Sequence, residues 1–488
     1  MRLGFQHSYS ALPSRFYARI NPTPVANPQL VVFNTRLAED LGLEANAVER
    51  EAAVMLSGNQ LPDDANPIAM AYAGHQFGAF VPRLGDGRAI LVGELRGCDG
   101  ILRDVQLKGA GLTPFSRDGD GRAVLGPMLR EYLISEAMHA LGVPTTRSLA
   151  VVTTGEPVYR DGALPGAVLT RVAASHVRVG TFQYFAARDD QDALRELLNY
   201  VIARHYPTAR DAESPALAVL NEVTQHQATL VANWMLLGFI HGVMNTDNMA
   251  ISGETMDYGP CAFMDNYDPK TVFSSIDHTG RYAYANQAAI AQWNLARFAE
   301  TLLPLIDPDI EKAVSRATEV LEAFIAQFDS RILAGMRRKI GLASGRDDDA
   351  ELVRRLLTAM QCSQADFTLT FRTLALMAET PGEQPRVREL FSPTSDIDRW
   401  LRDWQERLAC DPQTTAERVA SMRAANPAFI PRNHRVGSVL KAAEAGDYSP
   451  FRKLLGILNR PYDDQPQMSE YGQPPQPSER VLQTFCGT

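Results

Sequence analysis

A polar loop in the middle of the chain, residues 241–248, constrains the fold more than any other segment. It reads HGVMNTDN, and nine positions after Asn248 comes the tripeptide Asp257-Tyr258-Gly259. An amide oxygen and a carboxylate are ligands that a hard divalent cation such as Mg²⁺ or Mn²⁺ takes while it bridges phosphate oxygens. Read alone, the tripeptide would only indicate a turn. Together, the two segments predict a metal–nucleotide site.

The order of these residues is typical of kinase-type phosphoryl-transfer enzymes. In those enzymes a histidine opens the loop, the catalytic aspartate follows two places on, and a metal-binding asparagine follows seven places on. A second metal-binding aspartate then precedes an aromatic residue and glycine. His241, Asn248 and Asp257 fit this order, but Val243 stands where the catalytic aspartate is expected. Since valine cannot accept a proton, the standard kinase base is missing.

A second carboxylate, Asp247, directly precedes Asn248. It is a candidate general base for an acceptor hydroxyl, and a solvated loop acid or cap is the alternative. The vacancy at Val243 favours the base. His241 is interpreted as a brace of the loop. His75, in the segment YAGHQFG, is interpreted as a hydrogen-bonded structural residue, because no second histidine lies at metal-ligand spacing.

Two β-strands are expected upstream of the loop, at residues 89–95 and 104–108. Lys108 ends the second strand, and Glu131 lies 23 positions later on the expected next helix. A strand lysine held by a helix glutamate points at nucleotide phosphates in kinase-type sites. On their own, two such residues would more often form a surface ion pair. The downstream loop favours the functional interpretation.

Two further features could contact phosphates. The pentapeptide GDGRA occurs at 85–89 and 119–123, and its glycines let backbone N–H groups approach an anion, with Arg88 beside them. Plain turns are the alternative. Arg171 and Arg178 could clamp phosphate oxygens, although solvated arginines are commoner. Neither pentapeptide completes GxGxxG and no Walker A sequence is present, so Rossmann and P-loop sites are not expected.

Charge and composition narrow the class of partner. A net charge of −9 argues against nucleic acid, because a phosphate backbone needs a basic face, whereas a small phosphate ligand needs only a local positive cluster. The longest apolar stretch, residues 234–240, is too short to span a bilayer, and the N-terminus lacks the apolar core of a secretory signal. Five cysteines without CxxC spacing suit a reducing compartment. We therefore expect a cytoplasmic protein without a nucleic-acid or membrane partner.

The expected elements run from strands to helices along the chain. Strands are expected up to residue 172, followed by helices at 191–205, 215–240 and 286–303, and then by amphipathic helices over 305–456. This order predicts an α+β fold of two unequal lobes. The expected parts are an N-terminal extension (1–70), an N-terminal lobe (71–175), a C-terminal lobe with the catalytic loop (176–330), a helical C-terminal extension (331–460) and a flexible Pro/Gln-rich tail bearing Cys486 (461–488).

These segments together resemble the selenoprotein O family, also called the SelO or YdiU family. The motifs, the length and the tail cover nearly the whole chain, and the nonapeptide at 241–249 is highly specific. The matching segments are YAGHQFG at 72–78, QLKG at 106–109, DGRAV at 120–124, REYL at 130–133, SEAM at 135–138, HGVMNTDNM at 241–249 and DYGP at 257–260.

The resemblance implies a protein-kinase-like two-lobed fold that binds ATP in a flipped orientation. It implies a pseudokinase that transfers AMP to Ser, Thr or Tyr hydroxyls of proteins; UMP transfer from UTP is left open. An α-phosphate that faces the acceptor would expel pyrophosphate, whose charge the metal and basic groups stabilise. The implied roles are Asp247 as proton acceptor, Asn248 and Asp257 as metal ligands, Lys108 and Glu131 as an ion pair, and Gly85, Gly87, Arg88, Lys108, Asp120, Gly121, Arg171, Arg178 and Asp257 around ATP.

The cysteines and the overall activity each keep alternatives. Some family members carry selenocysteine third from the C-terminus, where this chain has Cys486. Cys486 and Cys261 could pair or sense oxidation, and free, inert thiols are the simpler interpretation. A kinase-like phosphotransferase and a catalytically silent nucleotide-binding scaffold are the two alternative functions.

Overall fold

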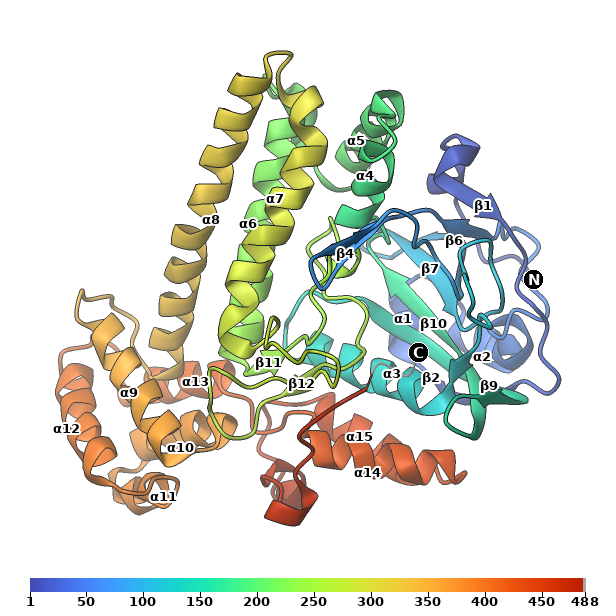
Figure 1. Ribbon diagram of the computed structural model, residues 1–488. Helices are drawn as coiled ribbons and strands as arrows, with labels where there is room; N and C mark the ends of the chain where they lie inside the picture. Colours follow the sequence, from blue (N-terminus) through green and yellow to red (C-terminus); the bar gives the residue numbers. More distant parts are fainter. Residues whose placement is uncertain (486–488) are drawn as a thin grey trace.

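The computed structural model describes residues 1–485, and an eight-stranded antiparallel sheet is its largest β element (Figure 1). The strands of this sheet are Tyr17–Arg19 (β1), Gln29–Phe33 (β2), Ile68–Met70 (β3), Ala89–Arg96 (β6), Leu102–Lys108 (β7), Ala123–Val124 (β8), Arg147–Tyr159 (β9) and Ala163–Ala173 (β10). Their order is β1-β3-β6-β7-β10-β9-β2, and β8 pairs with β10 beside this path. The register places Gln106 opposite Arg171 and Lys108 opposite Leu169.

Helices cover both faces of this sheet. Because successive strand residues point to opposite sides, neighbouring residues of one strand pack in different apolar clusters. Val168 packs in an apolar cluster with Leu37 and Val48, and its neighbour Leu169 packs in another with Leu129. Burial on both faces is clearest in β10, where residues 166–173 are all buried. The covering helices are Thr35–Asp40 (α1) and Ala45–Met55 (α2) on one face and Leu125–Ala140 (α3) on the other, and Asn433–Glu444 (α14) and Ser449–Leu458 (α15) pack against α3.

A second body of the protein is made of helices, and its three long helices, α6, α7 and α8, lie side by side (Figure 1). The members are Val179–Ala186 (α4), Gln191–His205 (α5), Pro215–Leu236 (α6), Gln287–Ile306 (α7) and Ile310–Lys339 (α8). The helix expected over 215–240 is shorter than predicted. It ends before Gly238, whose φ of +73° is left-handed, and residues 239–240 form a strand instead. None of the helices within residues 1–485 combines the length and apolarity needed to cross a bilayer.

The remaining helices pack around a stacked pair of indoles. The rings of Trp400 and Trp404 lie 5.5 Å apart in an apolar cluster that also receives the end of α8. The helices around this pair are Asp349–Ser363 (α9), Phe367–Glu379 (α10), Gln384–Arg388 (α11), Ser395–Ala409 (α12) and Thr415–Ala425 (α13).

The expected α+β fold with C-terminal helices is confirmed, while the kinase-like two-lobed arrangement and the domain boundaries stay predictions.

The tail, predicted to be flexible, packs on the body over its described part. Met468 and Tyr471 pack against the cluster between α3 and α15, and Thr484 forms a parallel bridge with Ser274. Cys486 lies outside the described residues.

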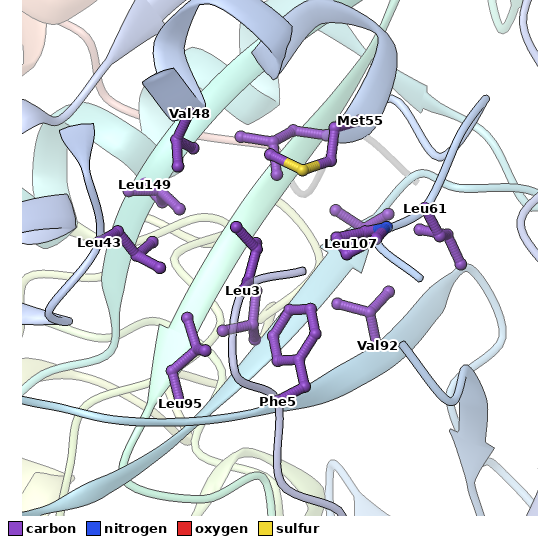
Figure 2. Close-up of a pocket in the computed structure, with 13 residues that line it drawn as sticks. Leu3, Phe5, Leu43, Val48, Met55, Leu61, Val92, Leu95, Leu107 and Leu149 are labelled. Carbon is purple, nitrogen blue, oxygen red and sulfur yellow. The ribbon is translucent and has the colours of Figure 1, made fainter. Parts of the chain in front are cut away.

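A small apolar cavity of about 10 Å³ lies between α2 and the sheet (Figure 2). A void of this size holds at most one water, and an apolar lining gives that water no partners. This cavity is therefore a packing defect and not a ligand site. It is lined by Leu3, Phe5, Leu43, Val48, Met55, Leu56, Leu61, Pro62, Val92, Leu95, Val105, Leu107 and Leu149.

Candidate active site

A short pair of strands brings the two halves of the central motif together. Phe239–Ile240 (β11) pairs with Ala262–Phe263 (β12), so the loop that follows β11 meets the segment that precedes β12. His241 lies at this junction, with its Nε2 2.9 Å from the carbonyl oxygen of Met256, and its main-chain N–H donates to Gln287. Burial lowers the pKa of His241. The histidine therefore links the two segments, as expected of a brace.

Three cationic side chains converge on Asp257. Its Oδ1 lies 3.1 Å from Lys108 Nζ and 2.5 Å from Arg171 Nη1, and its Oδ2 lies 3.5 Å from Arg178 Nη1. Burial alone would raise the pKa of Asp257, but Arg171, Lys108 and Arg178 hold it well below its usual value. The carboxylate therefore stays ionised, as a ligand for a divalent cation must be.

The predicted lysine–glutamate pair forms inside the protein. Lys108 Nζ lies 2.6 Å from Glu131 Oε2, and the two side chains are only 11% and 3% exposed. Arg171 Nη1 lies 3.4 Å from the other carboxylate oxygen of Glu131. One buried acid thus orients two of the cations that meet Asp257, which a surface ion pair would not do.

Asp247 lies in a single 3₁₀ turn, Thr246–Asn248, and is almost fully buried. Burial raises the pKa of Asp247 to about 6, although Arg178 pulls it down. Its Oδ2 lies 3.5 Å from Gln76 Nε2, and its Oδ1 has no hydrogen-bond partner within residues 1–485. A carboxyl group that titrates near neutrality and has unused acceptor capacity suits a general base.

Asn248 is oriented by Val243, the residue at the position where a kinase-type base was expected. Its Nδ2 donates to the main-chain oxygen of Val243 at 3.0 Å, which leaves its Oδ1 available as an oxygen ligand. With Asp257, it offers two oxygen donors of the kind that Mg²⁺ or Mn²⁺ takes. The part of the chain that the structure describes contains no group of three or more His, Cys, Asp or Glu side chains able to hold a metal by themselves.

A β-hairpin packs against the loop at 241–248. Its strands are Gly74–Gln76 (β4) and Ala79–Val81 (β5), within the segment that the sequence singled out only for His75 and the family motif. The main-chain N–H of His75 donates to Thr246 Oγ1 at 2.7 Å, and His75 Nδ1 lies 2.8 Å from Gln183 Nε2. His75 is thus a hydrogen-bonded structural residue, as expected. The hairpin also places Gln76 beside Asp247, which sequence reasoning missed.

Buried polar side chains hold Arg171 in place through hydrogen bonds. Gln106 Oε1 accepts from both Nε and Nη2 of Arg171, and Gln106 Nε2 donates to Asp86 Oδ2 at 3.2 Å. Burial raises the pKa of Asp86 to about 6. Both residues were missed, yet signals existed: Gln106 lies two positions before Lys108 on the same strand face, and Asp86 belongs to the repeated pentapeptide.

The two Gly-Asp-Gly-Arg loops need their glycines for close approach. Gly85 has a φ of +73°, and a β-carbon there would lie 2.3 Å from the ring of Phe115. Gly121 has a φ of +71°, and a β-carbon there would lie 2.2 Å from a main-chain carbon of Gly111. No other residue type fits either position without a shift of its neighbours.

A cleft of about 750 Å³ gathers the predicted residues, and its volume is typical of a small-molecule site. Asp120 is among them, but its carboxylate pairs with Arg160 at 2.8 Å. Cys261 is buried and does not line the cleft, and Cys486 lies beyond the residues described. The predicted residues that line the cleft are Gly85, Gly87, Arg88, Lys108, Asp120, Gly121, Glu131, Arg171, Arg178, Asp247, Asn248 and Asp257.

Comparison with known proteins gives a consistent result. The family model described as "Protein adenylyltransferase SelO" matches residues 1–459. The protein nucleotidyltransferase YdiU of Rhizobium meliloti (strain 1021) is 60% identical over 485 residues, which cover 99% of this chain and 99% of that protein. The protein of the same name from Bradyrhizobium sp. (strain ORS 278) is 60% identical over 486 residues, with 99% of each chain covered.

Proposed function

Because this chain belongs to the SelO family of protein adenylyltransferases, we propose that it transfers AMP from ATP to Ser, Thr or Tyr hydroxyls of proteins. The observation that carries the proposal is Asp247, a buried carboxyl four positions from the vacant base position, in the same cleft as Lys108, Arg171 and Asp257. We expect the cytoplasm as its location. UMP transfer from UTP is the variant that the same chemistry would allow.

The proposed step is an attack of the acceptor hydroxyl on the α-phosphorus of ATP. Asp247 takes the hydroxyl proton as the bond from oxygen to phosphorus forms, and the bond from the α-phosphorus to the bridging oxygen breaks. Pyrophosphate leaves with the bonding electron pair. Lys108, Arg171 and Arg178 are the fixed cations that stabilise the charge that develops on it.

The positions of these charges support the flipped ATP orientation that the family resemblance implies. The α-phosphorus must face Asp247 for AMP transfer, so the β- and γ-phosphates belong with the arginines and Lys108. Asn248 and Asp257 would hold the divalent cation, which would neutralise charge on the phosphates as a Lewis acid. The kinase-like two-lobed arrangement is part of this proposal, with the sheet and α3 on one side of the nucleotide and the catalytic loop on the other.

Separate labels on the α- and γ-phosphates of ATP test the proposal. The enzyme is incubated with Mg²⁺ or Mn²⁺ and candidate acceptor proteins, and protein-bound label is counted. AMP transfer retains the α-label and loses the γ-label, whereas a kinase-like phosphotransferase does the reverse. Asp247→Asn should reduce retention of the α-label by on the order of 100-fold or more while ATP binding is kept. A silent scaffold would retain neither label.

A further inference from the structure

The chain's own tail crosses the mouth of the nucleotide cleft. Of the last five described residues, 481–485, all but Leu482 line the cleft. The main-chain N–H of Thr484 donates to the carbonyl oxygen of Phe273 at 2.7 Å, and the N–H of Ser275 donates to the carbonyl oxygen of Thr484 at 3.1 Å. The tail is therefore paired with residues 273–275 through a single parallel bridge, Thr484 to Ser274, in the manner of a short strand.

The same tail residue also contacts the metal-binding motif. The Thr484 hydroxyl is buried and lies 2.5 Å from the carbonyl oxygen of Pro260, in the segment that continues from Asp257. Two main-chain hydrogen bonds and this hydroxyl are the main attachments of the strand. Leu482 and Phe485 on either side of Thr484 remain 75% and 72% exposed. A strand attached mainly through hydrogen bonds, with its apolar side chains in solvent, is suited to displacement.

The protein surface beside the tail also exposes large apolar side chains. Phe77 at the tip of the hairpin is 36% exposed, Ile276 is 57% exposed, and both line the cleft. Phe77 also packs edge-to-face on Tyr282, with ring centroids 5.2 Å apart, so it is held in place. Exposed apolar residues gathered at one opening mark an interaction site more often than scattered ones do.

We propose that residues 273–275, with Phe77 and Ile276, form the docking site for the acceptor protein, and that 481–485 occupies it as an intramolecular competitor. The occupant that fits is an extended segment with a hydroxyl residue directly followed by an aromatic one, as Thr484 is followed by Phe485 in the tail sequence VLQTF. Main-chain pairing with an exposed edge gives such a segment its affinity, and side-chain pockets give it specificity. This inference rests on the proposed function, since it names the acceptor class of that reaction.

A peptide-binding measurement tests the inference without requiring AMP transfer. A fluorescent peptide of residues 477–485 is titrated by anisotropy into the full chain and into a chain that ends at Arg480. The shortened chain should bind it at least tenfold more tightly, because its own strand no longer competes. Thr484→Val in the full chain should give an intermediate affinity, since it removes the hydroxyl near Pro260. Leu482→Ala and Cys486→Ser, measured under reducing conditions, serve as controls and should match the full chain.

Two results would overturn the inference. Equal or absent peptide binding by both chains, with normal ATP binding and thermal unfolding of the shortened chain, would mean that 273–275 is no docking edge. A tenfold loss of ATP affinity on shortening, without a gain in peptide binding, would make the tail a wall of the nucleotide site. Neither result depends on whether the transferred group is AMP, so failure of the proposed function would be recognised separately by the labelled-ATP assay.

Discussion

Gly74 lies against the carboxylate of Asp247 so closely that a β-carbon at position 74 would be 2.4 Å from Asp247 Oδ1. The φ of Gly74 is not in the left-handed region, so the glycine is needed here for space rather than for backbone conformation. The first strand of the hairpin thus limits where the side chain of the proposed base can lie.

Gly74→Ala should therefore displace the Asp247 side chain without touching the phosphate-binding cations. We expect AMP transfer to fall by on the order of 100-fold, because a misplacement of about 1 Å at a reacting group costs that much. ATP affinity, measured by calorimetry, should change little. Gly162→Ala is the matched control, since a β-carbon there meets no atom within 4 Å. Unchanged transfer by Gly74→Ala would contradict the placement of the base.

The pH dependence of AMP transfer should report Asp247. Since burial raises its pKa to about 6, the rate should fall as the pH drops through 6 and the carboxyl is protonated. Gln76 donates to the ionised form, so Gln76→Ala should raise the pKa further and move this acidic limb to higher pH by a few tenths of a unit. At pH 8 the rate of AMP transfer by Gln76→Ala should equal that of the unchanged protein. A limb that stays in place would show that Gln76 does not act on the base.

Much of this site could be predicted because motif spacing reports local geometry. Lys108, Glu131, Asp247 and Asp257 were found from their order along the chain, and they line one cleft. Gln76 was not, because its contact with Asp247 spans 171 residues and depends on how the hairpin packs. No periodicity in a sequence encodes such a contact.

The fold shows the same division between local and distant information. The strand at 89–95 was predicted nearly to its bounds, Ala89–Arg96, since it begins with an apolar run at residues 89–92. The pairing of Thr484 with Ser274 could not be predicted, because a single bridge leaves no pattern in composition.

Glu131→Gln should weaken ATP binding and destabilise the protein together. Glu131 is buried between Lys108 and Arg171, so its loss leaves two buried cations with Asp257 as their remaining acidic partner. We expect a loss of about 2 kcal/mol in the free energy of unfolding, measured by urea denaturation. Glu196→Gln is the control. Its pair with Arg15 is exposed, so the change should stay within about 0.5 kcal/mol. Equal effects of the two variants would contradict a buried role for Glu131.

Asp247 should also cost the protein stability in a pH-dependent way. Folding raises its pKa from 3.8 to about 6, with burial as the main cause. Well below pH 3.8 the carboxyl is neutral in both the folded and the unfolded state, and no cost arises. As the pH rises toward 6 the unfolded state ionises first, so folding loses stability, up to about 3 kcal/mol above pH 6.

Asp247→Asn should accordingly stabilise the protein at pH 8 and have little effect at pH 4, because the amide is neutral at both. Asp257→Asn provides the opposite case. The pKa of Asp257 is held low by three cations, so its carboxylate stabilises the folded state at pH 8 and its loss should destabilise. Urea denaturation of both variants at pH 8 and pH 4 measures the difference. Destabilisation by Asp247→Asn at pH 8 would mean that this carboxylate has a stabilising partner, and the case for a buried base held ready to accept a proton would fail.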